Sequence, residues 1–280
     1  MAEPAPDMTG KPRVDYGEHT WLELRELARR DDIVAVIPAA TLEDHGYHLP
    51  IDTDVRLVEA IARGAVEKFN AQGGAKALLC PTQVHGYTPH HLDFPGSVTL
   101  RWNVFVESLI DQGRSLIHHG FDRILIVNGH GSNIPLVNMA ARLLNVEHRT
   151  AICASSFYLT GAESLRVLDE HRTSGLGGMA HACELETSLY LAIRPDLVQM
   201  ERAVTEIPAS YTKHVFMDWT DGPLSFMPHW SAITESGVTG DAAAGTVEKG
   251  RIWLEQARKE IAEFIGEVAV RPRNPGVDHH

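Results

Sequence analysis

The stretch IVAVIPAATLEDHGYHLPIDTDVRLVEAIARGAVEKFN, residues 33–70, decides the fold class. It begins with a continuous apolar run, Ile33–Ala40, which is typical of a parallel strand buried on both faces. It ends with Val55–Asn70, where apolar residues recur every three or four positions, as on an amphipathic helix. A strand, a loop and a helix in this order predict one unit of a parallel α/β sheet.

The same alternation continues along the chain. Apolar runs predict further strands at 77–84, 123–128 and 151–157, and helical periodicity predicts helices at 103–119, 135–144 and from Ala244 to about Val268. Residues 202–240 have no clean period and are rich in tryptophan, proline and glycine. We expect this excursion to pack over the sheet edge or against a neighbouring subunit. One domain is predicted at 21–270, between a polar N-terminal arm (1–20) and a C-terminal tail (271–280).

Composition excludes several classes of protein. The chain has 280 residues, of which 44% are hydrophobic and 22% charged, as in a folded globular protein. A net charge of −12 argues against binding to nucleic acid or an anionic membrane. No apolar run reaches the roughly 18 residues of a membrane span, and the N-terminus does not resemble a signal peptide. Three widely spaced cysteines predict no disulfide framework, so we expect a cytoplasmic location.

Histidines and carboxylates gather in loops that follow the predicted strands. Ligands of open α/β sheets bind beyond the carboxyl ends of the strands. The loop after the first strand holds Glu43, His45 and Asp54. Asp54 is either a ligand or the N-cap of the following helix. Mixed carboxylate and imidazole groups suit Zn²⁺, Mn²⁺ or Fe²⁺ better than Ca²⁺.

Two further segments carry candidate groups. In NGHGSN, residues 128–133, the glycines allow a sharp turn that presents His130 for metal binding or catalysis; a phosphate cradle and a plain turn are the alternatives. In GGMAHACELETS, residues 177–188, His181 and Glu184 would share one face of a helix, with Glu186 pointing elsewhere. An acidic first helical turn would also explain both glutamates. Cys183 is either a soft ligand or a packed thiol.

Taken together, these motifs resemble the creatininase family of creatinine amidohydrolases. The resemblance covers roughly Asp32 to Val268 and rests on E-x-H-G-x-H-L-P-x-x-T-D at 43–54, F-P-G-S at 94–97, N-G-H-G-x-N at 128–133, H-A-x-E-x-E-T-S at 181–188 and the closing motif at 237–250. It implies a three-layer α/β/α sandwich around a mainly parallel sheet. It also implies a homohexamer and two divalent metal ions (Zn, Mn or Fe).

The resemblance also implies roles for single residues. Glu43 and His130 would bind one metal, His45 the other, and Asp54 would bridge them. Creatininase has a glutamate where this chain has Ser132, which argues against creatinine itself as the substrate. We therefore expect Glu184 to be the fifth ligand. Glu186 would be a supporting residue or an alternative ligand.

The expected activity is metal-dependent hydrolysis of a small polar molecule. A hydroxide held between the metals would attack a carbonyl, and His181 would carry the proton to the leaving group. Opening of a cyclic amide C–N bond is the leading reaction. Ring opening of a keto-inositol and deformylation are alternatives, as is an inactive relative that only binds metal or ligand. A nucleotide-binding oxidoreductase would need G-x-G-x-x-G after the first strand, where this chain has TLEDHG.

Residues around these loops are candidates for contact with the substrate. The candidates are Tyr47, His85, His90, His91, Asp93, Ser132, Trp219 and Trp230. So many donors and acceptors suggest a polyhydroxylated ligand, because each substrate hydroxyl needs a partner. For the aromatic residues, core packing or a subunit contact is an equal alternative.

Overall fold

A parallel sheet forms the centre of the molecule. The structure is a computed structural model, and it describes residues 13–74, 76–219, 222–274, 276 and 279. The sheet has four strands in the order β2–β1–β3–β4, namely β1 (Ile33–Ala39), β2 (Lys76–Leu79), β3 (Arg123–Asn128) and β4 (Ile152–Phe157). In the parallel register, Val36 of β1 lies opposite Leu79 on one side and Leu125 on the other. The predicted parallel sheet is confirmed.

Strand β2 is shorter than its apolar run predicts. It ends at Leu79, and Pro81, which follows closely, has no N–H to donate to a neighbouring strand. The chain touches the sheet again at Gln83, whose N–H donates to the carbonyl of Pro38 at 2.9 Å. The loop that follows β2 is therefore anchored at the carboxyl end of β1.

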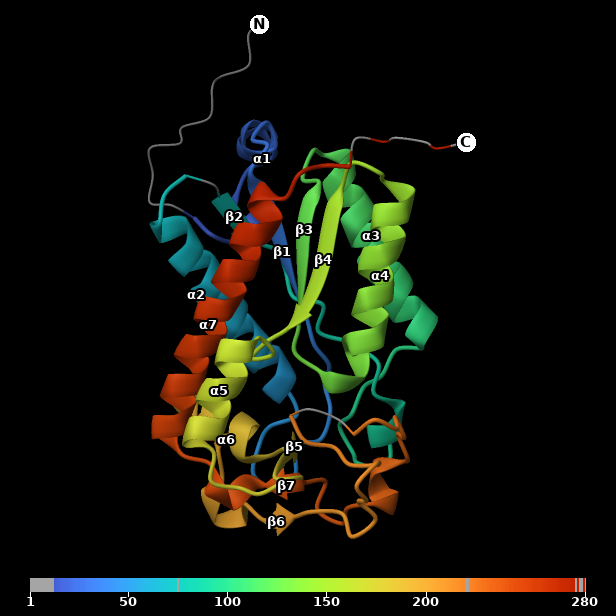
Figure 1. The fold of residues 1–280 in the computed structure, drawn as a ribbon, viewed down its shortest axis with the longest axis vertical. Coiled ribbons are helices and arrows are strands. Elements are labelled where there is room, and N and C mark those ends of the chain that lie inside the picture. Colours follow the sequence, from blue (N-terminus) through green and yellow to red (C-terminus); the bar gives the residue numbers. More distant parts are fainter. Residues whose placement is uncertain (1–12, 75, 220–221, 275, 277–278, 280) are drawn as a thin grey trace, which may run out of the picture.

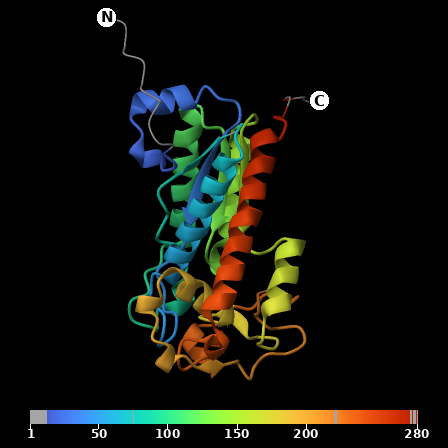
Figure 2. The same cartoon turned by 90° about the vertical axis from the view of Figure 1, so that its left-hand side faces the viewer.

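Helices cover both faces of the sheet, which gives the three-layer α/β/α architecture (Figure 1). Helices α2 (Thr53–Ala71) and α7 (Val247–Val270) lie on one face, and Figure 2 shows this pair in front of the sheet. Helices α3 (Trp102–His118) and α4 (Ile134–Glu147) lie on the other face. The remaining helices are α1 (Trp21–Leu27), α5 (Ala162–His171) and α6 (Glu184–Ile193).

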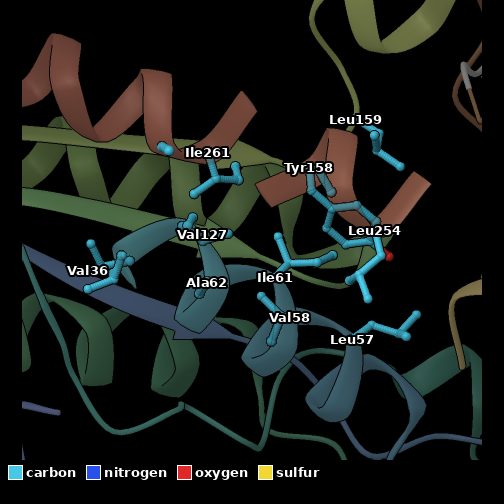
Figure 3. Close-up of a cluster of buried hydrophobic side chains, with 14 of the residues drawn as sticks. Val36, Leu57, Val58, Ile61, Ala62, Val127, Tyr158, Leu159, Leu254 and Ile261 are labelled. Carbon is cyan, nitrogen blue, oxygen red and sulfur yellow. The ribbon is translucent and has the colours of Figure 1, made fainter. Parts of the chain in front are cut away.

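The apolar core follows from the period of two along the strands. Val34 and Val36 of β1 belong to the cluster beneath α2 and α7, whereas Ile33, Ala35 and Ile37 belong to the cluster beneath α3 and α4. Figure 3 shows Val36 and Val127 of the sheet facing Ile61 of α2 and Ile261 of α7. Full burial of a valine or isoleucine side chain contributes about 1.5–3 kcal/mol. Both faces of β1 are therefore core, as its unbroken apolar run predicts.

A small antiparallel sheet lies beyond the carboxyl ends of the main strands, at the bottom of Figure 1. Its order is β5–β7–β6, made of Met179–His181, Thr239–Asp241 and Thr205–Glu206. The sequence did not predict this sheet, because strands of two or three residues leave no periodic signal. The described residues between 207 and 229 form neither helix nor strand. The 202–240 excursion thus lies over the end of the main sheet.

Helix α1 and the end of helix α7 lie at the opposite pole from the small sheet (Figure 1). Residues 1–12 of the expected polar arm are outside the described residues, whereas Tyr16 packs edge-on against Phe121 with ring centroids 5.6 Å apart. The domain boundaries at 21–270 stay a prediction. Within the described residues, none of the helices combines the length and apolar character that crossing a membrane requires.

Candidate metal centre

Asp54 lies between two histidines at the carboxyl end of the main sheet. Its Oδ1 is 3.3 Å from Nε2 of His45, and its Oδ2 is 3.1 Å from Nδ1 of His130. The same nitrogen of His130 is 3.0 Å from Oε1 of Glu43. All four side chains are buried. The loops after β1 and β3 therefore meet around one carboxylate.

Asp54 does not cap helix α2. The helix begins at Thr53, its N-cap residue is Asp52, and the Asp52 side chain makes no capping hydrogen bond. Asp54 lies in the first turn, and its carboxylate points to the histidines. A negative charge there is also favoured by the positive end of the helix dipole. Of the two alternatives that the sequence left open, the N-cap role is wrong, and the ligand role of Asp54 stays a prediction.

The NGHGSN segment holds His130 in place through close packing. A Cβ atom on Gly129 would lie 2.8 Å from Cβ of Val58 in α2, so only glycine lets the two elements approach this closely. Asn128 braces the segment, since its Nδ2 donates to the carbonyl of His130 at 2.6 Å. Asn133 ties it to the residue that follows β1 by donating to the carbonyl of Ala40 at 3.2 Å.

Three histidines turn one ring nitrogen toward the carboxylates and the other toward a backbone carbonyl. Nδ1 of His45 lies 3.3 Å from the carbonyl of Glu43, Nε2 of His130 lies 3.3 Å from that of Tyr87, and Nε2 of His181 lies 2.8 Å from that of Asp44. A carbonyl only accepts, so each outer nitrogen carries the proton when the ring is neutral. Each inner nitrogen then presents a lone pair, as in metal-binding histidines.

Glu186 joins this cluster, and Glu184 does not. Oε1 of Glu186 is 3.7 Å from Nε2 of His45. The carboxylate of Glu184 points away and accepts hydrogen bonds from Lys249 Nζ at 2.5 Å and from the N–H groups of Thr173 and Ser174, each at 2.9 Å. The expected fifth ligand, Glu184, is thus corrected by the structure. The carboxylate at that corner of the cluster belongs to Glu186.

The reason for this correction is the backbone between residues 181 and 184. His181 ends strand β5, and helix α6 begins only at Glu184, so the two residues do not share a helical face. Ala182 between them has a φ of 48°, a left-handed conformation that neither a strand nor a right-handed helix contains. Glu186 also accepts from the N–H of Cys183 through Oε2, at 3.4 Å. Cys183 is a buried N-cap residue next to the cluster.

Asp44 orients two of the histidines, a role that the sequence did not indicate. Its carboxylate accepts from Nδ1 of His91 at 2.5 Å, and its carbonyl accepts from Nε2 of His181. The ring of Trp230 stacks on His91 with centroids 4.7 Å apart and meets His181 edge-on at 5.2 Å. The indole N–H donates to the carbonyl of Gly237 at 3.0 Å. Trp230 therefore supports the histidines from outside.

Burial and the neighbouring charges strongly shift the pKa values of the residues in the cluster. Burial alone would raise the pKa of Glu43, but the charges of His130 and His91 outweigh burial and hold it well below its usual range. Burial alone would lower the pKa of His130, yet Glu43 and Asp54 raise it to about 10. Burial and the charges of His45 and His91 lower the pKa of His181 to about 4. The buried carboxylates thus stabilise positive charge within the cluster, whereas His181 stays neutral near pH 7.

Several buried atoms lack hydrogen bonds. Within the described chain, Oε1 of Glu43, Nε2 of His45 and Oδ2 of Asp54 have ion-pair neighbours but no hydrogen bond of acceptable geometry. Buried polar atoms in native proteins are almost always paired. Divalent cations would satisfy all three atoms together. The donor set therefore fits a metal centre.

A cavity of about 840 Å³ opens onto the cluster. Glu43, Asp54, His130, His181 and Glu186 lie at its inner end. Five of the predicted substrate-contact residues line it, namely His90, His91, Ser132, Trp219 and Trp230. Among these, Ser132 and His90 form a pair, with Oγ and Nε2 3.2 Å apart.

Three predicted substrate contacts lie outside this cavity. Tyr47 is half-exposed, and its hydroxyl reaches the carbonyl of Glu235 at 3.5 Å on another part of the surface. The carboxylate of Asp93 accepts from the hydroxyl of Ser231. His85 is absent from the described residues that line the cavity. The sequence placed these residues near the strand ends but could not show which way their side chains point.

Known proteins resemble this chain over most of its length. The family model Creatininase, described as creatinine amidohydrolase, matches residues 17–265. The chain is 31% identical to a mycofactocin precursor peptide peptidase of Mycolicibacterium smegmatis, over 79% of this chain and 80% of that protein. It is 28% identical to a creatinine amidohydrolase of Pseudomonas putida (91% and 96%) and 24% identical to a 3-dehydro-scyllo-inosose hydrolase of Thermotoga maritima (90% and 82%).

Solved structures agree with these relatives. A crystal structure of creatinine amidohydrolase is 27% identical to this chain, with a TM-score of 0.76 over 94% of this chain and 99% of that one. A creatininase described as the Mn form has a TM-score of 0.75 at 26% identity, over 91% and 98%. The fold, the buried cluster and the family match agree, and the chain belongs to the creatininase family of metal-dependent hydrolases.

Proposed function

We propose that this protein is a two-metal hydrolase that attacks the carbonyl of a small molecule, with a cyclic amide C–N bond as the leading target. The observation that carries the proposal is the position of Asp54, whose two oxygens face His130 and His45 separately. One carboxylate placed in this way suits two ions about 3.5–4 Å apart, as in two-metal hydrolases.

The cluster offers two sets of ligands. Glu43, His130 and one oxygen of Asp54 would hold the first ion. His45, Glu186 and the other oxygen of Asp54 would hold the second. Zn²⁺, Mn²⁺ and Fe²⁺ all accept these ligands. When bound, such ions polarise a carbonyl and lower the pKa of water.

In this proposal His181 moves the proton. Its Nε2 is engaged by the carbonyl of Asp44, so its Nδ1 is the basic atom, and this atom lies 3.7 Å from Oε1 of Glu43 at the inner end of the cavity. Nδ1 accepts the proton of the attacking water while the oxygen of that water bonds to the carbonyl carbon. The same nitrogen then returns the proton to the departing atom as its bond to carbon breaks.

Ring opening of a cyclic keto-polyol is a second candidate. It is favoured by the likeness to the 3-dehydro-scyllo-inosose hydrolase of Thermotoga maritima. It is also favoured by the His90–Ser132 pair in the cavity lining, whose imidazole and hydroxyl could form hydrogen bonds with a substrate hydroxyl group. In that reaction His181 would protonate carbon instead of nitrogen. The two reactions differ in their products, because only amide hydrolysis releases an amine.

The quaternary state and the compartment are also proposals. We propose a homohexamer in the cytoplasm. The outer face of α4 supports an assembly, because Met139, Leu143 and Val146 are exposed there at helical spacing. Light scattering of the purified protein should give the mass of six chains, and a monomer would contradict this.

Metal content and product analysis test the function together. Protein loaded with Zn²⁺ or Mn²⁺ should hold about two ions per chain and should hydrolyse members of a panel of lactams, formamides and keto-inositols. Titration of released amine and of new carboxylate separates the two candidate reactions. Protein that binds no transition metal under any loading would instead be an inactive relative, and the proposal would be withdrawn.

A further inference from the structure

The cavity above the metal cluster is much larger and more apolar than a small polar ring requires. Its volume of about 840 Å³ lies in the range of sites that enclose drug-sized ligands, roughly 300–1,000 Å³. The polar groups at its inner end account for only part of its lining. The outer part includes polar residues such as Ser210, Thr212 and His229, but its large side chains are apolar, namely Phe157, Phe216, Trp219, Leu224, Phe226 and Met227.

The charge of the lining restricts the substrate further. Among the described residues that line the cavity, none is a lysine or an arginine. In the proposed site Glu43, Asp54 and Glu186 are occupied by the metal ions, and the carboxylate of Asp218 is already bound by Arg172 at 2.8 Å. An anionic substituent away from the reacting carbonyl would lose its hydration without gaining a lysine or arginine partner from the described lining.

The large apolar side chains of the outer cavity are exposed to solvent, and a bound ligand would bury them. Phe226 is 64% exposed, Leu224 59% and Met227 49%, although all three border a cavity that ends at buried metal-binding groups. Trp219 is fixed beside them, with its indole N–H donating to the carbonyl of Leu159 at 2.8 Å and its ring stacked on Phe157 at 4.9 Å. A ligand that reached from the cluster to this wall would bury these side chains.

We infer that the substrate is a neutral or cationic carbonyl compound with a bulky apolar or aromatic arm, which lies along the wall formed by Trp219, Leu224 and Phe226. This inference rests on the proposed function and names the substrate class of the same site. It narrows the amide substrates to those in which the scissile carbonyl is joined to a hydrophobic group.

Hydroxamates, which chelate metal ions through two oxygens, test the inference by binding alone. Affinities of acetohydroxamate, 4-phenylbutanohydroxamate and an ω-carboxyalkyl hydroxamate of similar length would be measured on metal-loaded protein. Burial of each added methylene should tighten binding about fourfold, so the phenyl probe should bind best. The carboxyalkyl probe should gain little over acetohydroxamate. Equal affinities of the phenyl probe and acetohydroxamate would overturn the inference.

A matched pair of leucines controls for general effects on the fold. Leu224→Ala should weaken the phenyl probe several-fold and leave acetohydroxamate unchanged. Leu176→Ala removes a similarly exposed side chain (67%) that is not among the described residues of the cavity lining, and it should change neither probe. Equal losses in the two variants would place the probe elsewhere and contradict the inference.

A metal-free measurement separates this inference from the proposed function. If acetohydroxamate and metal both fail to bind, the metal mechanism fails, but the apolar wall is still testable with the neutral fluorophore N-phenyl-1-naphthylamine. Stoichiometric binding that Leu224→Ala weakens and Leu176→Ala does not would support the wall. Absence of binding to the unaltered protein would overturn it.

Discussion

The carboxylate of Glu184 lies 2.5 Å from the ammonium group of Lys249. This ion pair fastens the start of α6 to the start of α7, and the Glu184 side chain is fully buried. Glu184 therefore has a structural partner already, whereas Glu186, two residues later, faces His45. The two glutamates form a natural pair of test and control.

Glu186→Gln should lower metal affinity by about tenfold or more, because it removes the negative charge at one corner of the cluster. Glutamine can still complete the capping box at Cys183, so the start of the helix should persist. Titration calorimetry with Zn²⁺ or Mn²⁺ measures the change. Glu184→Gln is the control and should keep normal affinity. The reverse result would restore Glu184 as the ligand.

Asp54→Asn and His45→Ala should differ in the number of ions lost. Asp54 faces both histidines, so its loss should bring metal content below one ion per chain. His45 touches one side only, and its loss should leave about one ion bound. Elemental analysis after gel filtration gives the counts. If both variants lose a single ion, Asp54 does not bridge.

His181→Ala should retain the metal content of the unaltered protein while turnover of an identified substrate falls by about 10²–10⁴-fold. The reason is that Nδ1 is the neutral, correctly oriented base at the inner end of the cavity. Metal analysis and single-turnover rates on the same sample test both parts. Loss of an ion in this variant would make His181 a ligand.

Acid should weaken the Glu184–Lys249 contact. Burial tends to raise the pKa of Glu184, but the hydrogen bonds from Lys249, Ser174 and Thr173 outweigh it and lower the pKa below its usual value. The stability that this group adds is therefore present above the unfolded pKa of about 4.3 and is lost as the pH falls through the lower folded pKa.

Urea unfolding of Glu184→Gln measures this contribution. At pH 7 the free energy of unfolding of the variant should be lower by about 2 kcal/mol. The reason is that the mostly buried ammonium group of Lys249 loses its opposite charge. Toward pH 3 the difference from the unaltered protein should shrink, since a protonated Glu184 resembles glutamine. A difference that is constant with pH would show that the charge of Glu184 contributes nothing.

The main sheet and most of the cluster were predictable from local patterns. The apolar runs at β1 and β3 are long and unbroken, and parallel strands bring the loops at their carboxyl ends together. Glu43, His45, Asp54 and His130 therefore converge as expected. Each of these residues lies in a loop directly after a strand or in the first turn of a helix. Because few loop residues lie between the residue and the regular element, the sequence pattern is enough to place its side chain.

The predictions that differ from the structure concern residues whose side-chain position depends on a single backbone angle or on a contact between distant parts of the sequence. Spacing placed Glu184 on the face of His181, but the φ of 48° at Ala182 separates the strand from the helix. The role of Asp44 depends on contacts with His91 and His181, which lie far away in the sequence. The direction of Tyr47, His85 and Asp93 depends on loops without periodicity.

Glu186 divides its two oxygens between the cluster and its own helix. Oε1 faces His45, whereas Oε2 accepts from the N–H of Cys183 that opens α6. An ion that fixes this carboxylate therefore also restrains the first turn of the helix, so metal occupancy and local unfolding are thermodynamically linked. Amide hydrogen exchange at Cys183 should slow when metal is added, which makes one backbone proton a reporter of the ion.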